Sequence, residues 1–502
     1  MLKNIFNYKL LLVIIALTII FIRIPALTSR TIHIDEGWGI RGSEAVLSGD
    51  WQYSPENGHG STFYYLGAVI RTFSGTNIAI FRTFTTILML LSLLILWLIC
   101  RRELGKIGEI ILLAGLGLSS GMLFFSTYFI HEMLFILLTV VAFVSIELWL
   151  KTERGFWLPI FIVSASLMYM TKETAIFTYA SWFVAVILIM IWKNNFKDIL
   201  KKLVSLENIV FMALGLILTV VLYFFFFGKS LDLFRAPFLW LTERGLKMHL
   251  RPWYYFITLL FLHESMFLIL GGLSALFITL KKMWNPKILF FFLWFLLILI
   301  IYSSIPYKTP WLIPNIILPL ALFVAFGVST IWKKTGNNQL LISIVIVLII
   351  ISFTSLLSDN FLHPDREEKY DYTYLQAGKS YRNFLAIIDQ ISNLDKSTPL
   401  QIQIIGDKNE APLYVVTEKY NRIYEPFVPG LPVYINWWHS AEDTKKILSQ
   451  NGDDYVFLKF TYYTNGPDVD LFVRQDKWEE YKSTSGFITP TTIWADGTLR
   501  YD

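Results

Sequence analysis

The sequence has almost no cysteine and few charged residues. Cys100 is the only cysteine among 502 residues, so neither an intramolecular disulfide nor a multi-cysteine metal site can form. Charged residues make up 16% of the chain, hydrophobic residues make up 55%, and the mean hydropathy is +0.53. This composition excludes a string of soluble domains. The lysines and arginines lie in short connecting segments and form no single basic face, so nucleic-acid binding has no support.

Long apolar stretches recur through the first 357 or so residues. Each is about 20 residues long, enough to cross a hydrocarbon core of about 30 Å as a helix. We expect eleven transmembrane helices, at roughly 9–27, 78–99, 107–127, 133–150, 156–171, 174–192, 207–227, 263–280, 287–304, 311–331 and 339–357. The sequence therefore predicts a polytopic α-helical membrane domain over residues 1–357.

Basic residues cluster in the connectors that follow alternate helices. They are Arg101, Arg102 and Lys106; Lys151 and Arg154; Lys193, Lys197, Lys201 and Lys202; Lys281, Lys282 and Lys287; Lys333 and Lys334. The positive-inside rule places these connectors, and the N-terminus with Lys3 and Lys9, in the cytoplasm. The count agrees only if residues 61–75 form an amphipathic helix at the membrane interface. We expect the same of the short segment 253–262.

The composition changes abruptly after about residue 358. Residues 401–405, 414–417 and 455–460 have the pattern of strands, and residues 441–450 have the pattern of a helix. We expect a soluble α/β domain over residues 358–502. An odd number of crossings from a cytoplasmic N-terminus places it on the extracytoplasmic side of the cell membrane.

The first outer loop, residues 28–77, carries an acidic pair, Asp35-Glu36. Adjacent carboxylates near lipid repel each other and lose hydration, so some interaction should compensate for that cost. Asp35 could act as a general base toward an acceptor hydroxyl, with Glu36 or a bound divalent cation orienting it. The pair could equally cap the following helix by accepting free backbone N–H groups. Spacing leaves both roles open.

Further ionisable residues fall on the same predicted outer face. His59 follows a glycine-containing turn, His131 and Glu132 open a helix, and Lys172-Glu173 interrupt another pair of helices. Cations near a lipid phosphate would stabilise its developing charge, and the candidates are Lys172, Arg235, Arg244, Arg251 and Lys308. His249, in the same outer loop as the three arginines, is a further candidate for substrate binding. Each also has a simpler explanation: a solvated loop histidine, a snorkelling side chain, or a headgroup anchor such as Lys308 beside Trp311.

Several of these motifs occur together in one known superfamily. The acidic pair Asp35-Glu36, the turn Gly58-His59-Gly60, the break Lys172 to Ala175 and the break Pro310 to Leu312 resemble the GT-C glycosyltransferases. That superfamily includes protein O-mannosyltransferases and aminoarabinose transferases. The similarity is greatest to a prokaryotic flippase-associated branch linked to archaeal N-glycosylation. It covers roughly residues 9–335 and does not extend to the C-terminal domain. Ser61 departs from the pattern, because family members usually have proline after the His-Gly turn.

The resemblance implies a function and two central residues. It implies an inverting glycosyltransferase that moves a sugar from a polyprenyl-phosphate donor to a protein, lipid or glycan acceptor on the outer face. Asp35 would be the catalytic acid residue and Glu132 the second acidic residue of the site. A flippase that moves lipid-linked sugars without catalysis is the alternative. No cofactor is certain, although the acids could bind a divalent cation.

Overall fold

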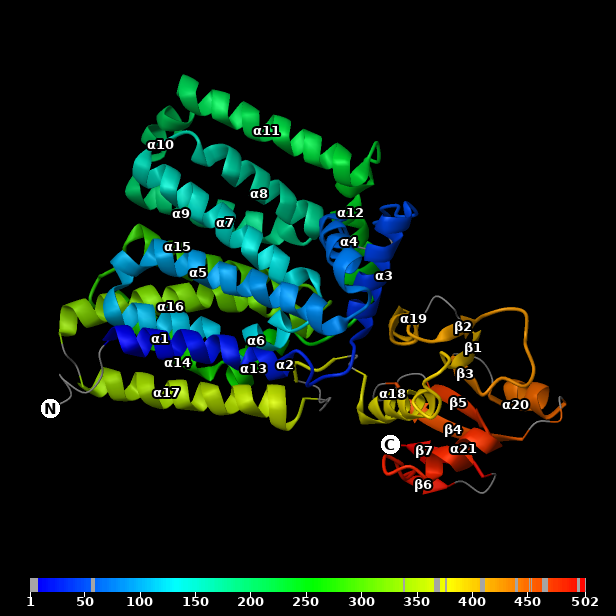
Figure 1. Cartoon of the computed structure of the whole chain (residues 1–502). Helices are drawn as coiled ribbons and strands as arrows, with labels where there is room; N and C mark the ends of the chain where they lie inside the picture. The colour runs from blue at the N-terminus through cyan, green and yellow to red at the C-terminus, as the bar shows by residue number, and fades with distance from the viewer. Residues whose placement is uncertain are drawn as a thin grey trace.

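The computed structural model shows a helical bundle with a smaller mixed domain at one end (Figure 1). It describes residues 8–55, 59–336, 339–364, 371–374, 377–406, 411–437, 441–450, 452, 454–462, 468–493 and 497–501. Lys3 and Gly58, named above, lie outside the described residues. The bundle contains α1 (Tyr8–Phe21), α2 (Arg23–Ala26), α3 (Ile34–Ser48), α4 (Thr62–Ser74), α5 (Ile78–Ile110), η2 (Ile111–Leu116), α6 (Ser120–Ser126), α7 (His131–Thr152), α8 (Trp157–Thr171), α9 (Ala175–Lys193), α10 (Phe196–Leu203), α11 (Leu206–Phe227), η3 (Asp232–Phe234), α12 (Ala236–Leu239), η4 (Trp240–Gly245), α13 (Tyr255–His263), α14 (Ser265–Leu280), α15 (Pro286–Ser304), η5 (Pro310–Leu312), α16 (Pro314–Thr335), α17 (Gln339–Leu357) and η6 (Ser358–Leu362).

The protein is a multi-pass membrane protein with fewer full-length spans than the expected eleven. Within the described residues, eight helices are long and apolar enough to cross a membrane, or nine if α13 and α14, bent by 102°, form one span. The segment expected at 78–99 and the first half of the segment expected at 107–127 are counted together as one stretch, Ile78–Leu116, and the second half of the latter contains the separate helix α6. The segment expected at 156–171 is α8, whose 15 residues reach only about 22 Å, less than the thickness of the hydrocarbon core.

The stretch Ile78–Leu116 reverses direction in its middle. Gly105 has φ 63° and ψ −177°, which is not helical. Trp97 Nε1 donates a 2.9 Å hydrogen bond to Glu109, and Leu93 approaches Gly117. Residues on the two sides of Gly105 thus lie together. The two expected spans are antiparallel neighbours. They count as one helix only because no break in the helical assignment separates them at Gly105.

The basic connectors meet at one end of the bundle. Lys287 forms ion pairs with Glu103 and Glu147, and Lys151 lies 2.9 Å from Glu147. Lys202 pairs with Glu153 at 2.5 Å. Because these residues come from the ends of different helices, the expected grouping of these connectors is present in the structure. That this end faces the cytoplasm remains a prediction.

The first long loop forms two short helices at the opposite end. α4 occupies almost the whole of the segment for which an interfacial helix was expected, and its 13 residues span only about 20 Å. α3 lies beside α4, and Gly67 of α4 sits so close to Ser43 of α3 that a Cβ there would be 2.1 Å from the Ser43 hydroxyl oxygen. The segment expected at 253–262 is α13, which bends sharply into α14.

Within the residues that the structure describes, the C-terminal domain is built on a seven-stranded mixed sheet, in the order β2-β1-β3-β5-β4-β7-β6. β1 pairs in parallel with β2 and β3, β5 is antiparallel to β3 and β4, β7 is parallel to β4, and β6 is antiparallel to β7. Its elements are α18 (Lys379–Ser392), β1 (Gln401–Gly406), α19 (Ala411–Val416), β2 (Asn421–Ile423), β3 (Val433–Trp437), α20 (Ala441–Gln450), β4 (Tyr455–Thr461), β5 (Asp468–Arg474), α21 (Gln475–Lys482), β6 (Thr492–Ile493) and β7 (Leu499–Tyr501).

Most of the expected elements of this domain are present, and one is wrong. β1, β4 and α20 match the segments expected at 401–405, 455–460 and 441–450. The segment 414–417, expected as a strand, instead belongs largely to the helix α19. Its β-branched valines favour a strand locally, but Tyr414 contacts Glu44 of α3 with a 2.8 Å hydrogen bond. Tertiary packing therefore overrides the local preference.

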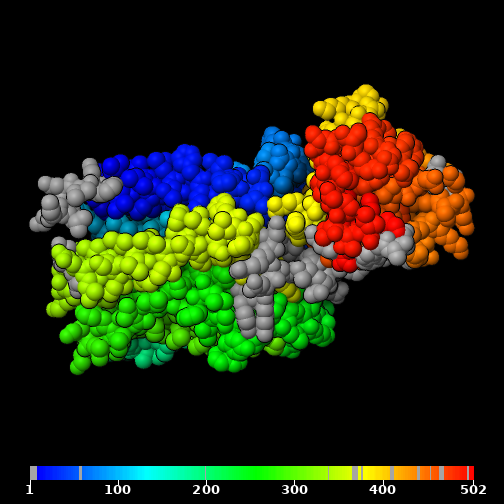
Figure 2. All heavy atoms as spheres, turned by 90° about the horizontal axis from the view of Figure 1, so that it is seen from below, coloured from blue at the N-terminus to red at the C-terminus, as the bar shows by residue number. Residues whose placement is uncertain are grey.

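The C-terminal domain lies at the end of the bundle that carries α3 and α4, as Figures 1 and 2 both show. Arg71 of α4 pairs with Glu418 of the domain at 2.8 Å and with Glu44 at 3.2 Å. Arg382 of α18 donates a 3.2 Å hydrogen bond to the Ser29 carbonyl. The domain therefore sits directly against the first loop.

The contact between α3 and α4 gives a test of the fold. Gly67→Ala places a methyl group against Ser43, and we expect it to lower the free energy of unfolding by about 1–3 kcal/mol through overpacking. Gly272 is the matched control, since it also lies inside a helix, α14, but has no heavy atom within 4 Å of an added Cβ. Gly272→Ala should be neutral or stabilising by up to about 1 kcal/mol. Denaturation in detergent micelles measures both, and equal effects would contradict the close contact.

Candidate functional site

The acidic pair lies at the start of α3, where the helix is capped by a histidine. His33 is the N-cap residue, and its Nδ1 accepts a 3.1 Å hydrogen bond from the Asp35 backbone N–H. The Glu36 carboxylate accepts a 2.9 Å bond from the His33 backbone N–H, which completes a capping box. The capping role that the sequence left open is therefore taken by His33 and Glu36. The backbone of Asp35 is fixed between them.

Glu36 also forms a fully buried ion pair with Arg82 of α5. The two guanidinium nitrogens Nε and Nη2 of Arg82 donate to the two carboxylate oxygens at 2.8 and 2.7 Å. Glu36 accepts a further bond from the Phe129 backbone N–H at 2.9 Å. Arg82 in turn donates to the carbonyls of Leu27, Arg30 and Thr31 at 2.8 to 2.9 Å. The pair therefore joins α3, α5, the preceding loop and the segment before α7.

These contacts determine the charge of Glu36. Burial by itself would raise the pKa of the Glu36 carboxyl, but the Arg82 guanidinium and the two backbone N–H groups outweigh it and hold the pKa below its usual value. Glu36 is 0% exposed, so its carboxylate does not reach a substrate in this structure. Glu36 was predicted as a catalytic residue, and we propose for it a positioning role instead.

Asp35 differs from its neighbour in both exposure and partners. It is only partly buried, and among the described residues its carboxylate makes no hydrogen bond or ion pair. Its charge acts on Tyr64, His249 and Tyr307, which come from α4 and from two loops far apart in the sequence. Asp35 therefore faces a site built by several segments.

A second group of charged residues lies at the starts of α7 and α9. Lys172 forms an ion pair with Glu132, and both side chains are buried. The His59 ring lies 2.9 Å from the Glu173 carboxylate and makes an edge contact with His131 at 4.9 Å. The predicted cation for phosphate, Lys172, is thus already neutralised by Glu132. His59, His131, Glu132, Lys172 and Glu173 do lie together, as their positions on one predicted face suggested.

Close packing explains why His59 reaches Glu173. Gly60 passes so near the end of α8 that a Cβ there would lie 1.9 Å from the Met170 carbonyl oxygen. The Glu173 carboxyl is buried, which would raise its pKa, but the adjacent His59 ring outweighs burial and holds that pKa below its usual value. Ser61, the departure from the superfamily pattern, is buried and accepts a 3.1 Å hydrogen bond from Trp51.

A basic loop after η4 closes another side of the site. Three backbone hydrogen bonds of 3.0 to 3.1 Å join it to the segment before η5. Tyr307 N–H donates to Gly245 O, Lys308 N–H donates to His249 O, and Arg251 N–H donates to Pro306 O. His249 has φ 48°, a left-handed conformation that costs energy for a residue other than glycine. Such an outlier points to a functional constraint on His249.

The electrostatics of this loop connect it to Asp35. Burial lowers the pKa of His249, and Arg251 and Arg244 lower it further against the opposing charge of Asp35. Burial raises the pKa of Tyr307 above its usual value, and the charges of Asp35 and Glu132 both add to that rise. Asp35 and Glu132 therefore act on the same hydroxyl. Lys308 is buried, and its ammonium donates to the Ile305 carbonyl.

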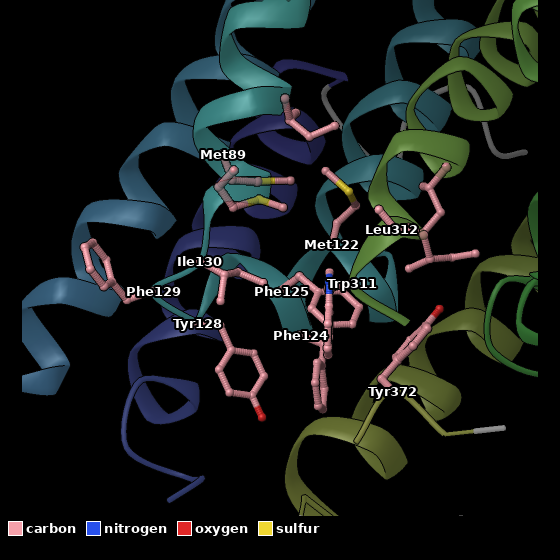
Figure 3. Close-up of a cluster of buried hydrophobic side chains, with 14 of the residues drawn as sticks. Met89, Met122, Phe124, Phe125, Tyr128, Phe129, Ile130, Trp311, Leu312 and Tyr372 are labelled. Atoms are coloured by element: carbon pink, nitrogen blue, oxygen red, sulfur yellow. The ribbon is translucent and has the colours of Figure 1, made fainter. Parts of the chain in front are cut away.

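The chain before the C-terminal domain completes the site. The Tyr374 carbonyl oxygen lies 2.8 Å from His33 Nε2, and its hydroxyl lies 2.7 Å from His249 Nδ1. Trp311 and the Arg251 guanidinium flank the Tyr374 ring, with centres at 5.9 and 5.2 Å. Figure 3 shows Tyr372, two residues earlier, beside Phe124 and Phe125 in an aromatic cluster. This segment thus packs into the bundle through Tyr372 and contacts His33 and His249 through Tyr374.

Sequence reasoning missed two of these residues. Arg82 interrupts an apolar helix, and an ionisable residue there is a signal for a buried partner. Tyr374 gave no signal, because its contacts are with residues 125 and 341 positions away. Among the described residues, no group of three or more His, Cys, Asp or Glu side chains could hold a metal ion.

Comparisons with known proteins show which fold this is. No family model matches the chain, and no curated protein is significantly similar in sequence. Among solved structures, ArnT from Cupriavidus metallidurans bound to undecaprenyl phosphate matches with TM-score 0.57 and 14% identity, over 92% of this chain and 97% of that chain. Its apo state matches with TM-score 0.57 and 13% identity, over 92% and 98%. The Archaeoglobus fulgidus oligosaccharyltransferase in the apo form matches with TM-score 0.48 and 13% identity, over 95% and 78%. The likeness to ArnT shows that the chain has the GT-C fold, as its motifs suggested.

The buried pair beneath the site is testable through stability. We expect Arg82→Gln to lower the free energy of unfolding by about 3–5 kcal/mol, because it leaves the Glu36 carboxylate buried without its partner. Lys202→Gln is the control, since Lys202 and Glu153 form an exposed pair worth less than about 1 kcal/mol. Denaturation in detergent at neutral pH compares the two. A similar small effect of both substitutions would show that the buried pair does not hold the site.

Proposed function

We propose that the protein is an inverting glycosyltransferase. It moves a sugar from a polyprenyl-phosphate donor to a hydroxyl or amide-type acceptor on a protein, lipid or glycan. The GT-C fold supports the class of reaction, and the ArnT match was made with undecaprenyl phosphate bound to that protein. We place the site on the outer face of the cell membrane, following the positive-inside assignment of the opposite end.

The observation that carries this proposal is the sorting of the acids around the site. Glu36 is paired with Arg82, Glu132 with Lys172, and Glu173 with His59. Asp35 is the acid whose carboxylate has no such partner among the described residues, and it is partly exposed. A carboxylate whose oxygens are not engaged by a cation or a hydrogen-bond donor can accept the proton of an acceptor group. Asp35 is therefore the general base.

The reaction needs only groups that the site and its substrates supply. For a hydroxyl acceptor, the Asp35 carboxylate takes the proton as the acceptor oxygen forms a bond to the anomeric carbon. The bond from that carbon to the phosphate oxygen breaks, and the electron pair leaves with the lipid phosphate. Attack opposite to the leaving group inverts the anomeric centre. Asp35 later releases its proton to solvent.

The basic loop is suited to the departing phosphate. Arg251 and Arg244 act on His249 together with Asp35, so cations and base lie around one small region. Positive groups fixed where negative charge develops lower the barrier without reorganising during the reaction. A guanidinium can also donate two parallel hydrogen bonds to phosphate oxygens. We assign donor phosphate recognition to this loop in preference to Lys172, which Glu132 neutralises.

Tyr374 gives His249 a defined role. Because the pKa of His249 is lowered, its ring is neutral near pH 7 and carries one N–H. If the Tyr374 hydroxyl donates to Nδ1, the proton of the imidazole is on Nε2. His249 then offers an N–H donor to a substrate oxygen beside Asp35. Tyr374 is thus a positioning residue that fixes this tautomer.

The role of Asp35 is tested by substitution. We expect Asp35→Asn to reduce release of polyprenyl phosphate from a panel of polyprenyl-phosphate sugars by about 10²- to 10⁴-fold, because an amide cannot accept the proton. Asp50→Asn is the matched control, an exposed aspartate of the same loop, and should keep full activity. Mass spectrometry of the released lipid measures both variants.

Two outcomes would contradict the assignment. Transfer that survives Asp35→Asn removes Asp35 as the base. If the unchanged protein consumes no donor but moves labelled lipid-linked sugar across vesicles, the protein is a flippase and the proposed chemistry is wrong.

The positioning role of Tyr374 makes a separate prediction. Tyr374→Phe removes the hydroxyl that contacts His249 but leaves the backbone carbonyl that contacts His33. We expect kcat to fall about tenfold with KM for the donor nearly unchanged, since the lost contact acts on transition-state stabilisation. Tyr372→Phe removes a hydroxyl that contacts buried Glu264 at 3.1 Å and should alter stability without this kcat effect. Equal kcat in both variants would exclude a special role for Tyr374.

A further inference from the structure

An apolar cavity of about 710 Å³ lies at the end of the bundle opposite the candidate site. Its walls come from the far ends of α7, α8 and α9 and from the start of α15, with Leu150, Leu158, Met190 and Pro286 among the lining residues. α8 is short at 15 residues, and its first turn lines the cavity. The cavity therefore lies at the end of α8 where a longer helix would continue.

The amphipathic helix α10 forms one side of this cavity. Phe196, Ile199, Leu200 and Leu203 of α10 all line it, at the spacing of one helical face. Phe183 and Phe196, which also line it, are 69% and 49% exposed. These exposed rings face the surroundings of the bundle, so the cavity opens toward the bilayer and not toward a closed interior.

The other face of α10 is cationic. Lys197 and Lys201 are exposed, and among the described side chains neither has a hydrogen bond or an ion pair. Lys202, by contrast, is paired with Glu153. The Glu147 and Lys287 side chains that reach the cavity neutralise each other. Among the side chains of α10 that the structure describes, the charges without an ion-pair partner are therefore positive.

A buried polar atom at the rim adds a second requirement. The side-chain oxygen of Asn195, another lining residue, is buried without a hydrogen-bond partner among the described residues. An unsatisfied acceptor of this kind costs free energy unless a donor reaches it. The occupant should thus combine apolar chains, a negative charge and a hydroxyl or similar donor.

We propose that this cavity is a binding site for an anionic phospholipid. The acyl chains occupy the space between α8, α9, α10 and α15, and the phosphate lies against Lys197 and Lys201. Basic residues next to apolar gaps between membrane helices recognise anionic headgroups in this way. The site is separate from the candidate active site, since it lies at the other ends of the same helices.

Native mass spectrometry of the purified, delipidated protein tests this proposal. Phosphatidylglycerol and phosphatidylcholine with the same acyl chains are added separately. We expect phosphatidylglycerol to be retained preferentially. We expect Lys197→Gln/Lys201→Gln to weaken its retention by about fivefold for each lysine removed without changing phosphatidylcholine. Lys229→Gln/Lys281→Gln removes two exposed lysines that lie outside α10 and should have no effect.

A second variant tests the position of the lipid. Val186 lines the cavity, and Val186→Trp fills part of it, so retention of both lipids should fall while the thermal unfolding temperature stays unchanged. Equal retention of the two lipids by the unchanged protein would overturn the proposal. So would phosphatidylglycerol binding that neither the lysine variant nor Val186→Trp weakens. These readouts do not involve sugar transfer, so they stand or fall independently of the proposed activity.

Discussion

The buried ion pair between Glu36 and Arg82 is the interaction on which the site depends. Placing two charges inside a helical bundle costs several kcal/mol for each ion, and the cost is recovered only with good geometry and additional hydrogen bonds. Here the Arg82 guanidinium donates hydrogen bonds to both carboxylate oxygens of Glu36. The carboxylate also accepts from a backbone N–H group, and the guanidinium also donates to backbone carbonyls. The pair therefore fixes the start of α3 relative to α5. Asp35, the residue before Glu36, is held in place by this pair and by the His33 cap.

This arrangement divides the work between adjacent carboxylates. The hydrogen bonds of Glu36 all go to groups that hold the fold together, and its lowered pKa keeps the carboxyl charged so that these bonds persist. The Asp35 carboxylate faces a site lined by Tyr64, Tyr307 and His249. Two identical charges side by side would repel, but the Arg82 guanidinium neutralises one of them. The acidic pair is stable because only one of its members remains uncompensated.

The sequence predicted the broad architecture because hydropathy and charge are local properties. Apolar length located the membrane helices, the period of α4 indicated a surface helix, and the basic connectors grouped at one end. The same locality explains the failures. Residues 414–417 have a strand composition, but most of them belong to a helix that packs against α3. The turn at Gly105 joins two membrane segments, so the number of long apolar helices differs from the number of expected spans.

The candidate site was predictable only as a set of residues on one face. Their pairing was not, because it depends on contacts between segments far apart in the chain. Lys172 was expected to meet a phosphate, and instead it neutralises Glu132, 40 positions away. Asp35 and Glu36 could not be told apart by spacing, since Arg82, 46 positions after Glu36, makes the difference.

The C-terminal domain is connected to the chemistry more directly than its separate fold suggests. Tyr374, in the segment that leads into it, contacts the cap residue of α3 through its carbonyl and the strained loop histidine through its hydroxyl. Arg71 and Glu44, on α4 and α3, also contact the domain through Glu418 and Tyr414. A shift of the domain would therefore change the positions of His33 and His249, which flank Asp35. The position of the domain and the alignment of Asp35 are therefore physically linked through these contacts.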